Sequence, residues 1–574
     1  MTVSNRHIAG VFDQIAIRLE ISGENPFRSR AYRKAAQEVL RCELQLAAVL
    51  EAGDPLPDLP GIGEVLRLKI RNIAENGTLE LLEQLRQQIP DSALELLRIR
   101  GLGPAKVRLL LENSGIDTVD GLKEILDKEG AEKLKGLGAS TADRVRRSLG
   151  EYLKHRGRTL RARAERVVEP LVTHLKETGL FETVVPAGSY RRGEETVLNI
   201  DLVAVAPDPQ AAMDAVQALE EVEQVLRRTD NAISFRPPAG PTYNLHMVPS
   251  SALGAALHLL TGSDGHNADL ALLAAGQGYR FEGFSLVGPE GPVHTPSEEL
   301  FYQTVGLPSI PPELRQGKGE IAAAQEGPLP QLVTTGDIRG DLHMHTPYSD
   351  GRDPLGALVR TARELGYEYL AFTDHTKNVA IANGMDAQRT ARYLDDIEAL
   401  AARLEGITLL KGIEVDIMKD GSLDLPDELL ERMDVVIASV HSHFNLPEDE
   451  MTDRVKRAFD NRFVNVLAHP TCRLIGGRSP LPLDVEKVIE HAAATGTMLE
   501  LNSNPERLDL HSEHCRLAAA AGVPLVISTD AHSVQQLDNI RYGVTQARRG
   551  WLQATDVANT LPLPELKELL YKKR

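Results

Sequence analysis

The sequence is poor in cysteine and in aromatic residues. Three cysteines among 574 residues, Cys42, Cys472 and Cys515, are too few and too widely spaced for a disulfide framework or for a zinc site built from thiolates. They suit a reducing compartment, and we expect a cytoplasmic protein. Aromatic residues make up only 4% of the chain, which argues against a surface on which the bases of a single strand stack.

Long apolar segments are also missing. No uninterrupted apolar run reaches about 18 residues, and the first residues, MTVSNRHIAGVFDQIAIRLE, lack a basic stretch followed by an apolar one. We therefore expect no membrane span and no secretion signal. A hydrophobic content of 42% with 25% charged residues is ordinary for a folded globular chain, and the length predicts about three to five domains.

The net charge of −18, taken over the whole chain, argues against a partner made of phosphate groups. The charge is unevenly distributed, since residues 1–180 carry +3, residues 181–340 carry −11 and residues 341–574 carry −10. The objection therefore fails for the first segment. It holds for the middle segment, although bound divalent cations would offset part of that charge.

Residues 1 to about 155 form a pattern of short amphipathic helices separated by glycine-containing turns, which predicts an all-α region. A Gly-x-Gly motif recurs three times in it, in LPGIGEVLRLKI, IRGLGPAKVRLLL and LKGLGASTADRV. Glycine permits a positive φ and a close approach of the backbone, so the amides that open the second helix can face a DNA phosphate. A single copy is better explained by a helix C-cap, but three copies favour DNA binding. The glycines concerned are Gly61, Gly63, Gly101, Gly103, Gly136 and Gly138.

The pattern changes twice further along the chain. From about Ala164, strand signals in VVPAGSYRR, IDLVAVAP and YNLHMVP alternate with helical stretches, which predicts an α+β region. The Pro/Gly-rich stretch GLPSIPPELRQGKGEIAAAQEGPLPQ is typical of an elongated linker with a short helix. After Asp337, apolar strand-like segments recur and each ends in a polar cluster, which predicts a parallel α/β barrel.

Histidines and carboxylates gather at the ends of these predicted strands. Because the carboxyl ends of parallel strands meet at one end of a barrel, we expect these side chains to converge there. Nine nitrogen and oxygen donors exceed the needs of one metal, so two or three ions of the zinc, manganese or iron type are expected. Metals grouped in this way support phosphoester hydrolysis. The predicted ligands are His343, His345, Asp350, His375, Glu414, His441, His469, Asp530 and His532.

The motifs GDLHMHTPYSDG, TDH, GIEVDI, SVHSHF, AHP and STDAH resemble those of the polymerase and histidinol phosphatase (PHP) superfamily over residues 337–574. The resemblance implies a distorted (β/α)7 barrel with phosphoesterase activity. Arg473 and His443 lie near ligands in the sequence, and each is interpreted either as a phosphate contact or as a solvated loop residue.

The middle of the chain resembles family X DNA polymerases, through GSYRRGEETVLNIDLVAV, LLTGSDGHN and EELFYQTVGLPSIPPELR. Together with NPFRSRAYRKAA and the glycine motifs near the N-terminus, the order of modules resembles a bacterial family X polymerase with a C-terminal PHP domain. The implied divisions are a lyase-like helix-hairpin-helix domain (1–90), fingers with helix-hairpin-helix motifs (91–160), a nucleotidyltransferase palm (161–250), a thumb (251–317), a linker (318–336) and the PHP domain (337–574).

The resemblance also implies a set of polymerase residues. Ser189 and Arg192 would hold the incoming triphosphate, and Asp201 would bind catalytic magnesium or manganese. The residues implied for the sugar and base of the nucleotide are Gly262, Asp264 and Asn267.

The sequence departs from the family at the metal-binding positions of the palm. Asn199 and Asn244 replace two of three carboxylates, and an amide oxygen brings no charge to offset the repulsion between two metal ions. Glu194 stands where the family has Lys and Leu198 where it has Gly. We therefore expect weakened polymerase activity.

Lys69 falls at the position of the lyase nucleophile of the family and is interpreted either as that nucleophile or as a phosphate contact. Tyr32, Arg33 and Lys34 form a candidate site for a 5′ phosphate or a solvated face. The same two interpretations, DNA backbone contact and solvent, hold for the basic residues Lys154, Arg156, Arg158, Arg161, Arg163 and Arg166.

The leading hypothesis is a monomeric DNA-repair enzyme, of the base excision type, that binds gapped, nicked or 3′-end DNA and dNTPs. Its PHP domain would act as a 3′–5′ exonuclease, with manganese as the expected metal and zinc or iron as alternatives. A second hypothesis makes the first 320 residues a DNA-binding scaffold with an inactive polymerase module. A third makes the barrel a phosphatase of small molecules.

Overall fold

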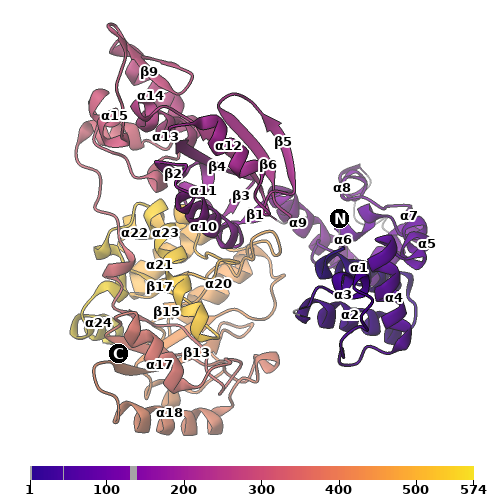
Figure 1. Cartoon of the computed structure of the whole chain (residues 1–574). Coiled ribbons are helices and arrows are strands. Elements are labelled where there is room, and N and C mark those ends of the chain that lie inside the picture. The colour runs from indigo at the N-terminus through magenta and orange to yellow at the C-terminus, as the bar shows by residue number, and fades with distance from the viewer. Residues whose placement is uncertain (1–2, 43, 129–138, 239, 574) are drawn as a thin grey trace. The chain divides into compact units, whose positions relative to one another are not determined.

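The computed structural model describes residues 3–42, 44–128, 139–238 and 240–573. The chain divides into two compact units (Figure 1), one formed by Met1–Arg156 with Gly476–Ser479 and the other by Gly157–Ile475 with Pro480–Arg574. Each unit is described by itself.

Among its described residues, the first unit consists of helices joined by loops and contains no strand. Helix α1 begins after Ser4, whose side chain accepts a hydrogen bond from the amide of His7, and ends at Gly23 in the left-handed conformation. Apolar faces of the helices meet in two cores, one around Phe12 and one around Val107. The helices are α1 (Asn5–Ser22), α2 (Pro26–Arg41), α3 (Leu46–Glu51), α4 (Glu64–Asn76), α5 (Glu80–Gln88), α6 (Asp91–Leu96), α7 (Pro104–Ser114), α8 (Val119–Lys128) and α9 (Ala139–His155).

The second unit begins with a five-stranded sheet in the order β2-β4-β7-β6-β5, which corresponds to the predicted palm. The parallel neighbours β4 and β7 place Asp201 beside Asn244. Asn199 precedes Asp201 by two residues, so both share a face of the sheet. The elements are β1 (Thr159–Leu160), α10 (Arg161–Glu177), β2 (Thr183–Pro186), α11 (Gly188–Arg191), β3 (Thr196–Val197), β4 (Asn199–Val205), α12 (Pro209–Gln217), β5 (Gln224–Arg228), β6 (Ala232–Arg236) and β7 (Thr242–Met247).

Helices and a three-stranded antiparallel sheet follow, in the segment predicted as the thumb. The predicted linker does not run extended along its whole length: Ile321 and Ala324 pack into the same apolar core as Phe301, and Glu320 is fully buried beside His266. The elements are α13 (Leu253–Thr261), α14 (Asp264–Gly276), β8 (Arg280–Glu282), β9 (Ser285–Gly288), β10 (Gly291–Pro292), α15 (Glu298–Thr304) and α16 (Glu320–Glu326).

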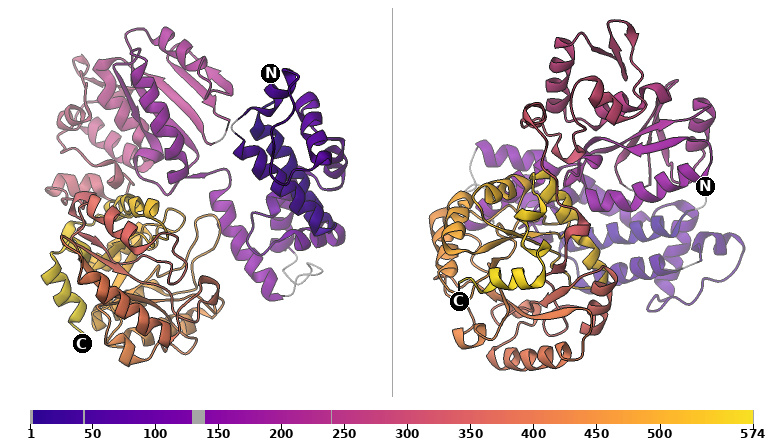
Figure 2. Two further views of the ribbon diagram at one scale, coloured as in Figure 1. Left: turned by 60° about the horizontal axis from the view of Figure 1, so that its bottom comes forward. Right: turned by 90° about the vertical axis from the view of Figure 1, so that its left-hand side faces the viewer.

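The remainder of the second unit is a seven-stranded parallel sheet in which sequential strands are neighbours, from β11 to β17. Backbone hydrogen bonds from His345 to Ala531 and from Asp530 to His343 join the segments that follow β11 and β17 and nearly close the barrel. Figure 2 shows helices around the outside of these strands. The strands are β11 (Gly340–Asp341), β12 (Tyr369–Phe372), β13 (Thr408–Asp416), β14 (Val435–Ser439), β15 (Val466–Leu467), β16 (Met498–Asn502) and β17 (Leu525–Ser528). The helices are α17 (Leu355–Glu364), α18 (Ala387–Ala401), α19 (Asp427–Leu430), α20 (Glu448–Phe459), α21 (Val485–Thr495), α22 (Ser512–Ala520), α23 (Ile540–Arg549) and α24 (Leu563–Tyr571).

Burial explains why these strands are apolar along their whole length. In β12, β14 and β17 every residue is buried, because the barrel interior covers one face and the helices cover the other. The predicted fold class, an all-α N-terminal region, an α+β middle and a C-terminal barrel, is thus confirmed. Among the helices of the described residues, none has the length and apolar character that crossing a membrane requires.

Phe372 on β12 has no exposed surface and belongs to the barrel core. We expect Phe372→Ala to lower the free energy of unfolding of the barrel by about 3–5 kcal/mol, because it removes a buried ring and leaves a cavity. Denaturant unfolding followed by circular dichroism measures the change. Leu517→Ala, at a side chain that is 44% exposed, is the control and should change it by less than about 1 kcal/mol.

Candidate functional site

The nine predicted metal ligands lie at one end of the barrel. Glu414 is inside β13, and the others lie in the segments that leave the strands at their carboxyl ends. Of the seven barrel strands, β11 to β17, only β16 contributes no predicted ligand. His343, His345 and Asp350 follow β11, His375 follows β12, His441 follows β14, His469 follows β15, and Asp530 and His532 follow β17.

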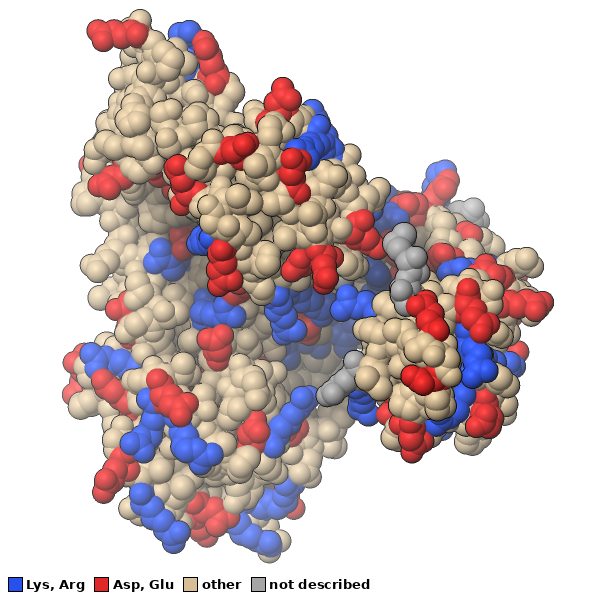
Figure 3. All heavy atoms as spheres, in the orientation of Figure 1, with Lys and Arg blue, Asp and Glu red and all other residues tan. Residues whose placement is uncertain are grey.

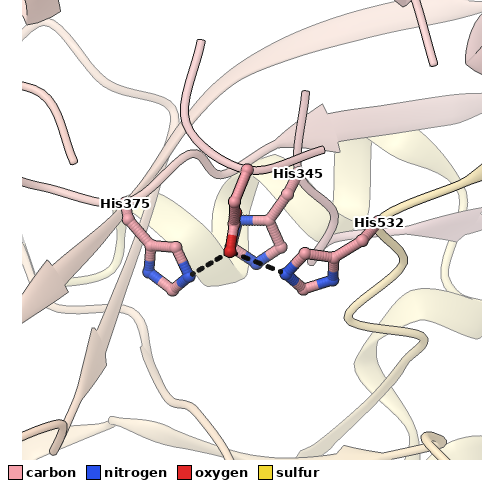
Figure 4. A group of neighbouring side chains, drawn as sticks. His345, His375 and His532 are labelled. Carbon is pink, nitrogen blue, oxygen red and sulfur yellow. Dashed lines mark ion pairs between the residues drawn. The ribbon is translucent and has the colours of Figure 1, made fainter. Parts of the chain in front are cut away.

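Their donor atoms fall into three groups small enough to hold a metal ion each. In the first, Asp350 Oδ2 lies 3.4 Å from His532 Nε2 and 3.8 Å from His375 Nε2 (Figure 4). His345 completes this group and also belongs to the second, which is His343, His345 and Asp530. The third is His375, Glu414 and His441, and His469 Nε2 lies 3.2 Å from the same Glu414 carboxylate. Because His345 and His375 are shared, the three groups form one connected cluster.

The cluster fits divalent cations. Within the described part of the chain, His345 Nδ1, His375 Nδ1 and both oxygens of Glu414 are buried without a hydrogen bond of ordinary geometry, although His375 Nδ1 lies 2.7 Å from Glu414 Oε2 as an ion pair. Buried donor atoms of this kind are costly unless something pairs with them. A cation bound by imidazole nitrogens and carboxylate oxygens satisfies them.

The electrostatics of the cluster keep its carboxylates charged. Burial would raise the pKa of Glu414, but His375, His441 and His343 together hold it well below its usual range. Burial, followed by the neighbouring His375 and His532, lowers the pKa of His345 to about 3. Against the effect of burial, the same carboxylates raise the pKa of His375, and hydrogen bonding to Asp350 raises that of His532 to about 9, so metal binding at these rings must displace protons.

Further polar residues around the cluster are absent from the predicted set. Asp374 accepts hydrogen bonds from Thr346 and Ser349 and so fixes the loop that carries Asp350. Glu500 on β16 accepts a hydrogen bond of 2.7 Å from His343 Nδ1. Arg507 lies with its Nε 3.8 Å from Asp530 Oδ2. The strand ends pointed to the ligands. Asp374 stands in the quoted motif TDH without having been assigned a role, and no pattern in the sequence marked Glu500 or Arg507.

The two residues interpreted as phosphate contacts differ in their surroundings. The guanidinium of Arg473 forms an ion pair with Glu195 of the palm, and its Nη1 to Oε2 distance is 3.2 Å. Glu194 likewise pairs with Arg549, at 2.9 Å. Neither glutamate contributes to a metal site in the palm. His443 is exposed and has a positive φ of 54°.

The palm site contains one carboxylate held by two amides. Asn199 Nδ2 donates to both oxygens of Asp201 at 2.9 Å, and Asn244 Nδ2 donates to Oδ1 at 2.9 Å. Ser234 Oγ donates to the amide oxygen of Asn244 and so fixes the orientation of this amide. Burial would raise the pKa of Asp201, but hydrogen bonds from His246, Asn244 and Asn199 lower it.

The structure brings some of the predicted nucleotide-binding residues together at the end of α13. The guanidinium of Arg192 donates to the carbonyl of Thr261, which places it beside Gly262. Asn267 Nδ2 in α14 donates to the carbonyl of Leu259 in α13 at 2.8 Å and so links the two helices on either side of this turn. Asp264 opens α14, and Ser189 lies in α11. Figure 3 shows acidic side chains spread over the visible face of the palm and thumb.

The glycine motifs adopt the backbone geometry that their sequence predicts. Gly61 and Gly101 have positive φ of 75° and 100°, and Gly63 and Gly103 precede α4 and α7 as N-caps. Each leaves a helix N-terminus without a side-chain cap. Gly136 and Gly138 lie outside the described residues.

The basic residues near these motifs are largely engaged in contacts within the chain. Lys69 on α4 donates to the hydroxyl of the buried Tyr32, and Arg33 pairs with Glu20. Arg156 pairs with Glu95 at 2.9 Å, and Arg163 with Glu506 at 2.9 Å. Each of these residues therefore has a partner without DNA.

Comparison with known families assigns the modules. Residues 3–79 match a helix-hairpin-helix domain and residues 93–151 a SAM-like helix-hairpin-helix tandem. Residues 256–316 match the DNA polymerase beta thumb, and residues 341–503 match the PHP domain. The chain is therefore a modular protein in which helix-hairpin-helix and polymerase elements precede a PHP barrel.

Comparison with individual proteins identifies the family within this class. The chain is 35% identical over 569 residues to the DNA polymerase/3′-5′ exonuclease PolX of Bacillus subtilis (strain 168), with 98% of this chain and 99% of the relative covered. It belongs to the PolX family, the bacterial family X DNA polymerases with a C-terminal PHP domain, as its motifs indicated. A probable phosphatase of Thermoanaerobacter sp. (strain X514) is 29% identical over 247 residues, covering 41% of this chain and 95% of the relative. A probable phosphatase of Syntrophotalea carbinolica is 29% identical over 239 residues, covering 40% and 94%.

The shared position of His345 leads to a test of the cluster. We expect His345→Ala to remove about two of the bound divalent ions, because this residue belongs to two groups, and His441→Ala to remove about one. Equilibrium dialysis against Mn²⁺ with elemental analysis measures the bound metal. His491→Ala, on α21 and paired with Asp460, is the control. Equal metal content in His345→Ala and the wild type would contradict the assignment.

Proposed function

We propose that this protein is a DNA-repair enzyme whose PHP barrel hydrolyses phosphodiesters from the 3′ end of DNA, with manganese as the metal. The connected cluster of three ligand groups carries the proposal, because it brings donors for several ions to one barrel end. The name of the Bacillus subtilis relative, a polymerase and 3′-5′ exonuclease, supports it. When bound, divalent ions supply a hydroxide near neutral pH and neutralise charge on a phosphoryl group.

The residues of the chain set the geometry for this chemistry. His345 and His375 each face two groups and so hold neighbouring positions at a fixed separation. Glu414, fully buried, supplies charge at the centre. Asp350, at the rim, has its pKa lowered to about 2, because hydrogen bonding to His532 and the nearby imidazoles outweigh burial, and stays ionised over the physiological range.

The contacts in the palm support the proposal that the polymerase activity of this protein is weakened. Asp201 is the single carboxylate of the three family positions, and the amide groups of Asn199 and Asn244 donate to its oxygens. Metal binding there requires both amides to turn away and still leaves two charges fewer than the family uses. Nucleotidyl transfer with dNTPs is therefore proposed as a slow, manganese-dependent activity.

The helix-hairpin-helix modules support binding of gapped or nicked DNA without sequence readout. Uncapped helix N-termini at Gly63 and Gly103 present backbone amides, which contact phosphates and not bases. We propose that the protein acts as a monomer in the cytoplasm, where its free cysteines remain reduced.

A scaffold function is the second candidate, favoured by the amide-bound Asp201. In this case, the palm and thumb bind DNA ends and the barrel alone reacts. A two-activity assay separates the candidates. A 3′-labelled gapped duplex is incubated with Mn²⁺, with and without dNTPs, using the wild type and two variants.

We expect the double variant His343→Ala with His345→Ala to lose at least about a hundredfold in nuclease rate, because both rings belong to one metal group. Asp201→Ala should keep the nuclease and lose the residual extension. Robust extension by the wild type that Asp201→Ala abolishes would exclude the scaffold. Faster hydrolysis of p-nitrophenyl phosphate than of DNA ends would indicate a small-molecule phosphatase and overturn the proposal.

Restoring the missing carboxylates tests the palm. We expect Asn199→Asp with Asn244→Asp to raise single-nucleotide incorporation by at least about tenfold, or about 1.4 kcal/mol of transition-state free energy. Single-turnover extension of a gapped duplex measures the rate. Asn231→Asp, at an exposed position of the turn between β5 and β6, is the control. No gain in the double variant would mean that features other than metal charge limit the palm.

A further inference from the structure

The sixth strand of the barrel, β16, carries no predicted ligand but places a fully buried carboxylate, that of Glu500, beneath the cluster. A buried charge is costly unless it is fully paired, so its surroundings indicate what it does. The residues around it come from four different strands or strand ends.

Four donors converge on this carboxylate. Oε1 lies 2.7 Å from His343 Nδ1 and 2.6 Å from the hydroxyl of Ser528. Oε2 accepts from the backbone amide of His469 and, at 3.2 Å, from Asn502 Nδ2. Ionised carboxylate oxygens accept several hydrogen bonds and donate none, which matches this set of partners.

The contact with Glu500 fixes which nitrogen of His343 carries the proton when the ring is neutral. Because Glu500 only accepts, the proton of a neutral His343 lies on Nδ1. Nε2 then carries the free electron pair, and it faces the cluster, 3.2 Å from His345 Nε2 and 3.6 Å from Asp530 Oδ1. A carboxylate behind a ligating histidine orients the ring and raises its basicity.

Glu500 also connects two other ligand segments. The amide of His469 binds it directly, and Asn502 Nδ2 bridges it to Asp530 Oδ2 at 3.1 Å. One side chain therefore orients His343 and restrains the backbone at His469 and the carboxylate of Asp530.

We propose that Glu500 is a positioning residue of the metal cluster, which sets the tautomer and direction of His343 for metal binding. Its effect on catalysis rests on the proposed nuclease function, whereas its effect on metal affinity does not. A purely structural role would stabilise the barrel without acting through His343.

A double-mutant cycle in metal affinity tests this. We expect Glu500→Gln, which keeps the shape and removes the charge, to weaken Mn²⁺ binding about 10- to 100-fold. In a His343→Ala background the same change should cost much less affinity, because Glu500 then has no ring to orient and only its contacts with His469 and Asn502 remain. Isothermal titration with Mn²⁺ measures the affinities, and Glu490→Gln at an exposed position of α21 is the matched control.

Several outcomes are distinguishable. Additive losses in the two backgrounds, or wild-type affinity in Glu500→Gln, would overturn the positioning role whether or not the protein degrades DNA. A loss coupled to His343 in a protein without nuclease activity would support the role of Glu500 and overturn the proposed function. If thermal melting shows that Glu500→Gln does not fold, Ser528→Ala, which removes one donor from the same oxygen, replaces it in the cycle, with a smaller coupled loss expected and additivity again excluding the proposal.

Discussion

Five imidazoles approach the buried carboxylate of Glu414, at N to O distances between 2.7 and 3.6 Å. This crowding is possible because the barrel closes and brings the carboxyl ends of its strands to one place. The loop held by Asp374 and the close backbone approach at Gly412 contribute to this convergence. The cluster in turn contains buried donor atoms without hydrogen bonds of ordinary geometry, which a bound cation would satisfy, so metal binding and the stability of the fold are coupled.

The palm shows the opposite situation. Its sheet has the parallel pairing that places three family positions together, but two of them are amides. Amide groups hydrogen-bond to the remaining carboxylate, so the site is satisfied by the protein itself. One chain therefore combines a site that requires metal with one whose polar groups are already paired.

Much of the fold and of the ligand set could be predicted from the sequence, because both follow local rules. Apolar strands that end in polar clusters indicate parallel strands, and their ends indicate the side chains that meet. Glu500 could not be found in this way, since it lies inside the strand segment MLELN and its partners come from distant segments. Arg473 was interpreted as a phosphate contact or a solvated residue, but Glu195, 278 residues away in sequence, pairs with it. Such pairings depend on how the palm packs against the barrel, which no local pattern encodes.

The contact between the palm loop and the barrel has a consequence for dissecting the protein. Glu194 and Glu195 are neutralised by Arg549 and Arg473, and a side chain at Gly193 would collide with Thr545 of α23. A fragment that ends before the barrel would leave Glu195 without its arginine and Glu194 with Arg192 alone, and an isolated barrel would expose two arginines in the surface that contacts the palm. Residues 157–574 are therefore the fragment to express when the palm, thumb and barrel are studied without the N-terminal unit. In a fragment cut between the polymerase and PHP modules, any change in activity reflects the lost palm–barrel contacts as well as the missing module.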